Sequence, residues 1–107
     1  MQSWDIRSMK VEPHKPQILR SSAEARSIAI NLPAGDELQE HRTHEAAYLI
    51  VADGEVEVTQ ADEVIAAPAG FLAYFDANEP RRVLAISDAR VVLILGPWPG
   101  EGHPRHS

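Results

Sequence analysis

The sequence predicts an all-β fold, an antiparallel sandwich or barrel built as one domain. About eight short apolar or alternating segments follow one another, most of them from Arg26 onward, and turns rich in Gly, Pro, Asn and Asp separate them. No segment has the pattern of a convincing amphipathic helix. Short strands at such spacing are typical of antiparallel sandwiches and barrels. A chain of 107 residues has room for a single domain.

The first half of the chain supplies three clear strands. Residues 27–32 alternate between apolar and polar, and the Pro-Ala-Gly sequence at 33–35 predicts a turn. Residues 46–51 form a continuous apolar run, as in a strand that is covered on both faces. Asp53-Gly54 is a strong tight-turn signal, and residues 55–59 then alternate strictly, which predicts a strand with one face in solvent.

The second half repeats this pattern of strands and turns. We expect strands at residues 64–66, 71–75, 83–86 and 90–95, with turns at 60–63, 68–70, 76–80 and 87–88. Residues 1–25 are expected to form an N-terminal arm or edge strand, held by Trp4, Ile6 and Met9. The barrel itself then spans residues 26–96. Residues 97–107 form a Pro- and Gly-rich tail that cannot join a sheet, with Trp98 as its anchor.

Composition excludes several classes of function. The 16 acidic residues outnumber the 10 basic ones, whereas a nucleic-acid partner requires clustered Lys and Arg. The absence of cysteine excludes disulfides and zinc–thiolate sites. No apolar run approaches the roughly 18 residues of a membrane span, and no leader sequence opens the chain. We therefore expect a cytoplasmic protein with neither a nucleic-acid nor a membrane partner.

The stretch from Gly35 to Arg81 carries two motifs in sequence. Gly35, His41 and Gly54 keep the spacing of the first motif of the cupin superfamily, in which a second His and a Glu stand where this chain has Thr43 and Ala47. Gly70 opens the second motif, whose Pro, Gly, His and Asn positions here hold Asp76, Asn78, Arg81 and Ala85. The chain therefore resembles the small single-domain bacterial cupins of the RmlC-like superfamily, with degenerate metal-binding motifs. An alternative alignment that uses Pro68-Ala-Gly70 for the second turn is rejected, because it places a strand where the turn must be.

The resemblance implies a double-stranded β-helix, or jelly-roll, barrel. In cupins of this kind three His and one Glu hold a divalent transition metal inside the barrel, so the substitutions at Thr43, Ala47 and Arg81 favour a protein without a metal cofactor. Fold does not fix function, and cupins include enzymes, regulators and storage proteins, so the resemblance leaves open whether this chain is an enzyme. Both faces of the strand at 46–51 are apolar, so its outer face needs a cover. A second subunit is the simplest cover, and we therefore expect a homodimer.

Arg81 is the substitution with the clearest chemical meaning. A guanidinium beside a metal ion is unfavourable, whereas its planar fork suits a carboxylate or phosphate. We therefore expect a small, anionic ligand in a pocket formed by His41, Thr43, Tyr48, Tyr74 and Arg81. In the competing interpretation, Arg81 pairs with Asp76 or Glu79 at the same turn, or extends into solvent.

A metal site of unusual composition is the alternative prediction. Side chains two apart on a strand share a face, so His44 faces away from His41 unless a bulge resets the register. With such a bulge, His41, His44 and Glu45 become candidate ligands for a divalent transition metal, and the protein becomes a metal-dependent enzyme of the isomerase or oxygenase type. A third interpretation is a structural or regulatory protein whose barrel is filled by its own side chains.

Overall fold

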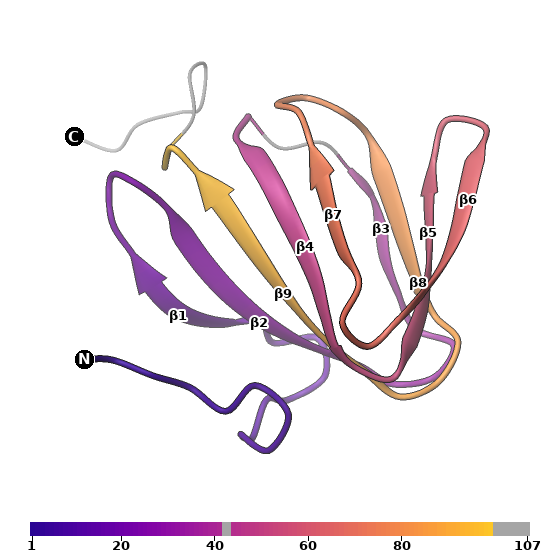
Figure 1. Ribbon diagram of the computed structural model, residues 1–107, viewed down its shortest axis with the longest axis horizontal. Coiled ribbons are helices and arrows are strands. Elements are labelled where there is room, and N and C mark those ends of the chain that lie inside the picture. The colour runs from indigo at the N-terminus through magenta and orange to yellow at the C-terminus, as the bar shows by residue number, and fades with distance from the viewer. Residues whose placement is uncertain (42–43, 100–107) are drawn as a thin grey trace.

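A computed structural model describes residues 1–41 and 44–99, with the side chains of residues 39–41 outside the description. Its nine strands are β1 (Gln17–Ser21), β2 (Arg26–Leu32), β3 (Glu37–His41), β4 (Ala46–Asp53), β5 (Glu55–Gln60), β6 (Glu63–Pro68), β7 (Leu72–Phe75), β8 (Arg81–Ala85) and β9 (Ala89–Gly96). They form two antiparallel sheets, one in the order β1-β2-β9-β4-β7 and the other in the order β3-β8-β5-β6 (Figure 1). The predicted all-β class is confirmed.

The hydrophobic core lies between the two sheets. On β4, Ala47, Leu49 and Val51 are fully buried and belong to the core, whereas Tyr48 between them is exposed. This alternation follows from the strand period of two, so even a strand that is apolar throughout has one inner and one outer face. Val58 on β5 and Val83 on β8 lie opposite each other and line the other side of the core.

The turns at one end of the barrel pack tightly against one another, at the bottom of Figure 1. Gly54, in the β4–β5 turn, has a φ of 73° and touches the backbone of the β8–β9 turn. In that second turn Ser87 Oγ accepts a hydrogen bond from the Glu55 N–H at 3.0 Å. Asp88 Oδ1 accepts one from the Ala34 N–H at 2.8 Å, which ties in the β2–β3 loop. We call this end of the molecule the closed end.

The opposite end collects the segments that carry the two motifs. The end of β3, the starts of β4 and β8, the β5–β6 turn and the loop at residues 76–80 all lie there, at the top of Figure 1. Asn78 in that loop has a φ of 66°, a left-handed conformation that Asn tolerates better than most residues. The predicted turn at 76–80 is therefore present between β7 and β8, and Arg81 is the first residue of β8. We call this end the mouth.

Residues N-terminal to β1 form an arm on the outer face of the five-stranded sheet. Arg90 on β9 donates hydrogen bonds from Nη1 to the carbonyl oxygens of Ile6, at 2.8 Å, and Met9, at 2.7 Å. Asn31 on β2 donates from Nδ2 to the carbonyl oxygen of Val11 at 2.8 Å. Ile6 and Met9 are half-buried in this arm, whereas Trp4 is 41% exposed. At the other end of the described chain Trp98 packs on the barrel, with the Arg26 guanidinium 4.0 Å from its ring centroid.

Candidate functional site

The most unusual side chain at the mouth is Arg81. It is 4% exposed and is, with Glu45, one of two charged residues buried among the described part of the chain. Its Nη2 is fully enclosed, and within that part of the chain no atom accepts a hydrogen bond from it. Burial lowers the pKa of Arg81, because removal from water disfavours the charged form. A buried cation with an unused donor is costly, so it marks a place where an acceptor belongs.

The fold explains how Arg81 comes to be buried. It is the first residue of β8 and shares the inner face with Val83 and Ala85, since all three are buried while Arg82 between them is exposed. Arg82 binds Glu37 instead, with Nη2 2.7 Å from the Glu37 carboxylate. Two consecutive arginines therefore have opposite environments, one inside the barrel and one on its surface.

The competing interpretation of Arg81, as a paired or solvated turn residue, is wrong. No ion pair joins Arg81 to either acid of the turn within the described residues. Glu79 accepts hydrogen bonds from the Asp76 N–H, at 2.9 Å, and from the Gln60 side-chain amide. Asp76 accepts one from the Tyr74 hydroxyl, an interaction that raises the pKa of Tyr74. Both acids of the turn thus have partners other than Arg81.

Of His41 and Thr43, the structure describes only the backbone of His41. The β3–β8 ladder pairs His41 directly with Arg81, after a register irregularity that lies between Leu38 and His41. The backbone position of His41 is therefore beside Arg81, while its side chain lies outside the described part of the molecule. Thr43 lies entirely outside the described residues. Gln60 follows the Thr59–Arg82 pair at the end of β5, which puts it next to Arg81 on the other side.

The structure places Tyr48 and Tyr74 away from Arg81, which corrects the predicted pocket. They face each other across β4 and β7 with ring centroids 5.0 Å apart, and they are 46% and 51% exposed. Both lie on the outer face, because their neighbours Ala47, Leu49 and Phe75 occupy the inner one. Phe75 is the aromatic residue that does approach Arg81, with its ring centroid 5.3 Å from the guanidinium carbon. Phe75 was not among the predicted site residues, although its place directly before the turn at 76–80 puts it at the mouth.

Two of the four positions that the family resemblance equates with metal ligands do not fit a metal ion. Ala47 is buried in the core and carries no donor atom, and Arg81 offers only hydrogen-bond donors and a positive charge. Of the alternative trio, His44 is exposed and Glu45 is buried, and the side chain of His41 lies outside the described part of the molecule. Among side chains that the structure describes, no three His, Asp or Glu gather in one place.

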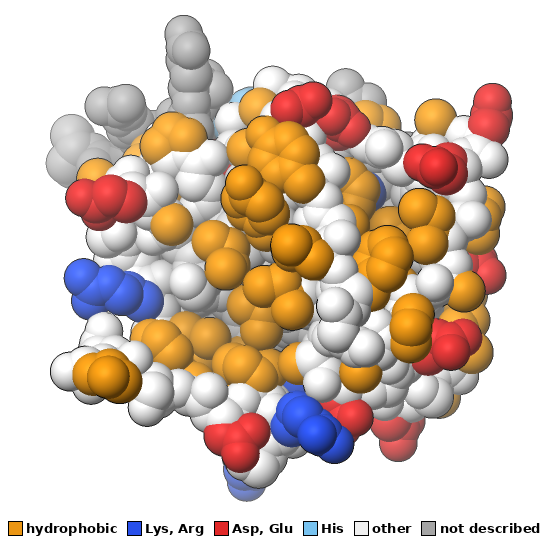
Figure 2. All heavy atoms as spheres, in the orientation of Figure 1, with side chains coloured by type: hydrophobic (Ala, Val, Ile, Leu, Met, Phe, Trp, Pro, Cys, Tyr) orange, Lys and Arg blue, Asp and Glu red, His pale blue; other side chains and the backbone are white. Residues whose placement is uncertain are grey.

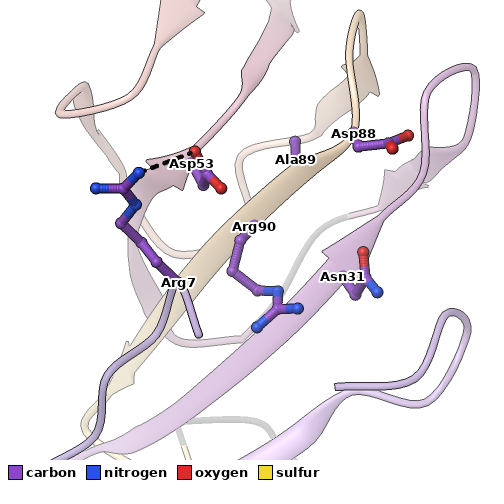
Figure 3. A pocket seen from close by; sticks show the side chains of 6 residues that line it. All are labelled: Arg7, Asn31, Asp53, Asp88, Ala89 and Arg90. Atoms are coloured by element: carbon purple, nitrogen blue, oxygen red, sulfur yellow. Dashed lines mark ion pairs between the residues drawn. The ribbon is translucent and has the colours of Figure 1, made fainter. Parts of the chain in front are cut away.

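A polar cavity lies under the N-terminal arm near the closed end (Figure 3). Its volume is about 90 Å³, and its lining includes Arg7, Asn31, Asp53, Asp88 and Arg90. Arg7 pairs with Asp53 at 3.8 Å, and the other three side chains make the hydrogen bonds to the arm and to the β2–β3 loop described above. The polar groups of this cavity are therefore engaged in holding the fold together.

Comparison with known proteins gives a family and a set of similar structures. A model of the cupin domain matches residues 29–96. A comparison with curated proteins finds no match. No helix within the described residues is long and apolar enough to cross a membrane.

Solved structures share the arrangement of strands at low sequence identity. An RmlC-like cupin protein from Desulfovibrio desulfuricans is 23% identical, with a TM-score of 0.81 over 91% of this chain and 97% of its own. An RmlC-like cupin family protein with a double-stranded β-helix fold from Methanocaldococcus jannaschii is 21% identical, with a TM-score of 0.75 over 87% of this chain and 86% of its own. A conserved protein of unknown function from Streptococcus pyogenes is 17% identical, with a TM-score of 0.75 over 98% of this chain and 90% of its own. At these identities the likeness shows the fold, and the double-stranded β-helix predicted from the motifs is confirmed.

Proposed function

This chain belongs to the cupin domain family, and we propose that it binds a small anion, a carboxylate in the simplest case, inside its barrel, with Arg81 in place of a metal. The observation that carries the proposal is the enclosed Nη2 of Arg81, which has a hydrogen to donate and no described acceptor. A carboxylate supplies that acceptor and neutralises the buried charge in one step. Because the bond is charge-assisted and away from water, it is stronger than an ordinary hydrogen bond.

His41 completes the proposed site. Its backbone lies directly opposite Arg81 in the β3–β8 ladder, so we assign it a hydrogen bond to the second oxygen of the bound anion or the role of a proton donor. Thr43 is assigned a further hydrogen bond to the ligand. Tyr48 and Tyr74 leave the proposal, because they stand on the outer face of the barrel.

The test is a titration with acetate and phosphate that follows the melting temperature. A ligand at a hundred times its Kd stabilises the folded state by about 2.7 kcal/mol, and we expect that response in the wild type and its loss in Arg81→Met. Arg82→Met is the matched control, since it removes an arginine one position away that lies on the surface and binds Glu37. It is expected to respond to acetate like the wild type, and sodium chloride at equal ionic strength is expected to have no such effect.

Two results contradict the proposal. Equal stabilisation of the wild type and Arg81→Met shows that the anion binds elsewhere. A transition metal that purifies in stoichiometric amount with the wild type and is lost in His41→Ala, as elemental analysis would show, restores the metal site built from His41, His44 and Glu45.

We also propose that two copies of the chain associate through the outer face of β4 and β7. Tyr48, Leu72 and Tyr74 are 46%, 58% and 51% exposed there, and the half-buried Ile50 and Ile94 lie next to them in the ladder. We call these five residues the β4–β7 patch. Figure 2 shows hydrophobic side chains gathered over β4 and β7, in the middle of the face seen in Figure 1. A patch of this kind on a small domain marks an interaction site.

A second copy is the occupant that the charges favour. The chain carries a formal net charge of −6, so two copies repel each other over most of their surfaces. The β4–β7 patch contains no charged residue, and a two-fold axis brings identical patches together. Part of the same sheet face is already covered, because the arm lies on β2 at Asn31 and on β9 at Arg90.

Leu72→Glu is expected to convert the dimer to a monomer. The wild type should sediment with twice the 11.8 kDa mass of the chain. The variant should sediment as a monomer, because its dimer would bury an unpaired carboxylate in each copy, which is unfavourable. Val64→Glu on β6 is the matched control, since Val64 is also 58% exposed but lies outside the patch. A wild type that stays monomeric at every concentration contradicts the proposal, as does a dimer that survives Leu72→Glu.

A further inference from the structure

An apolar slot opens between the two sheets at the side where β6 and β7 form their edges. Its volume is about 100 Å³. Val58, Ile65, Phe71, Ala73 and Phe75 contribute apolar walls, and Tyr74 also borders the slot. The polar residues Gln60 and Glu63 stand on either side of the turn between β5 and β6. Val58 and Phe75 are core residues, 5% and 3% exposed, so the slot reaches from the surface to the interior of the barrel.

The slot and Arg81 share a wall. Phe75 lines the slot, and the Arg81 guanidinium carbon lies 5.3 Å from the centroid of its ring. Val58, also in the slot, is paired with Val83, which follows Arg81 by two positions on the same inner face of β8. Two residues along a strand span about 7 Å. The buried cation therefore lies within the length of a small molecule from the apolar walls.

We propose that the ligand of Arg81 is a monocarboxylate with a short apolar group, whose carboxylate binds Arg81 and whose apolar group fills the slot. This inference rests on the proposed function and names the class of anion. An apolar cavity of about 150 Å³ takes benzene, so the slot holds a smaller group, a chain of about three to five carbon atoms. Glu63 at the slot disfavours a second carboxylate at the far end of that chain, since like charges repel.

The experiment measures the Kd of the wild type for acetate, propionate, butyrate, pentanoate and hexanoate at fixed ionic strength by calorimetry. Each methylene that enters the slot is expected to lower the Kd by up to about fourfold, until the slot is full and the Kd stops falling. Pentanol, which has the apolar chain without the charge, is expected to bind at least tenfold more weakly than pentanoate. Adipate is expected to bind more weakly than hexanoate.

Variants of the slot separate the apolar contact from the ionic one. Ile65→Phe fills the slot, so acetate should bind as in the wild type while the gain along the series disappears. Val64→Phe is the matched control, because Val64 is the neighbouring residue on β6 but is exposed and does not line the slot. Ala73→Val is a smaller change in the slot wall, and it serves the same purpose if Ile65→Phe folds poorly.

The outcomes distinguish this inference from the proposed function. If acetate binding depends on Arg81 but the Kd is flat along the series, the slot is not part of the site and the anion site stands. If the series behaves identically in Ile65→Phe and Val64→Phe, the inference is also wrong. If the gain along the series persists unchanged in Arg81→Met, or if no carboxylate binds the wild type, both proposals fail.

Discussion

Gly54→Ala is expected to destabilise the protein by more than about 3 kcal/mol. A Cβ atom at this position would lie 2.1 Å from the carbonyl oxygen of Asp88 and 2.8 Å from the Cα of Ala89. These are backbone atoms at the closed end, and the hydrogen bonds of Ser87 and Asp88 to neighbouring turns prevent them from moving aside cheaply. The φ of 73° adds strain for any residue with a side chain. Chemical denaturation of the purified variant measures the loss.

Gly35→Ala is the matched control, because it isolates the conformational part of the effect. Gly35 has a φ of 88°, but no heavy atom lies within 4 Å of the position that its Cβ would occupy. We expect a loss of about 1 kcal/mol from the left-handed backbone alone. Equal losses for the two variants would mean that the contact between the β4–β5 and β8–β9 turns is not tight.

Arg81→Met is expected to stabilise the protein by about 1–3 kcal/mol when no ligand is present. The guanidinium is buried, and its Nη2 lacks a described acceptor. A methionine of similar length removes that cost and keeps apolar contacts with the core. For a domain near this size, each kcal/mol corresponds to a rise in melting temperature of about 4–8 °C. Thermal unfolding in a buffer free of carboxylate and phosphate is the measurement.

The same variant is expected to lose its advantage when the anion is added. At saturating acetate the wild type gains the binding free energy, whereas Arg81→Met gains nothing, so the difference in melting temperature shrinks or reverses. Arg82→Met should be neutral within about 0.5 kcal/mol in both buffers, since exposed ion pairs contribute little. An Arg81→Met protein that is clearly less stable than the wild type without ligand would show that the guanidinium has a partner in the folded chain.

Much of the fold was predictable because its turns require particular residues. Asp53-Gly54 predicted a tight turn, and Gly54 adopts the positive φ that such a turn uses. Asn78 was predicted to be a left-handed residue at the turn before Arg81, and its φ is 66°. The segments of one-sided alternation, such as residues 55–59, also showed which face points inward. In each of these places a local rule determines the structure.

The candidate site was only partly predictable, for two physical reasons. The run at 46–51 is apolar on every residue, so its pattern could not show which face is inner, and Tyr48 was placed in the barrel when it lies on the outside. Tyr74, which pairs with Tyr48 in the β4–β7 ladder, was placed in the barrel as well and also lies on the outside. Arg81 was recognised in the sequence as the residue after the turn at 76–80. Its burial depends on the packing of both sheets around it, which no local sequence pattern predicts. The slot beside Phe75 arises from residues on three strands and has no sequence signature.

The closed end has a consequence for how this protein can change over evolution. Its turns are fixed to one another through backbone contacts at Gly54 and Asp88, far from the mouth. A substitution at the mouth, where Arg81 and the β5–β6 turn lie, leaves those contacts untouched. Ligand preference can therefore diverge among descendants of this chain without disturbing the turn contacts that hold the closed end together.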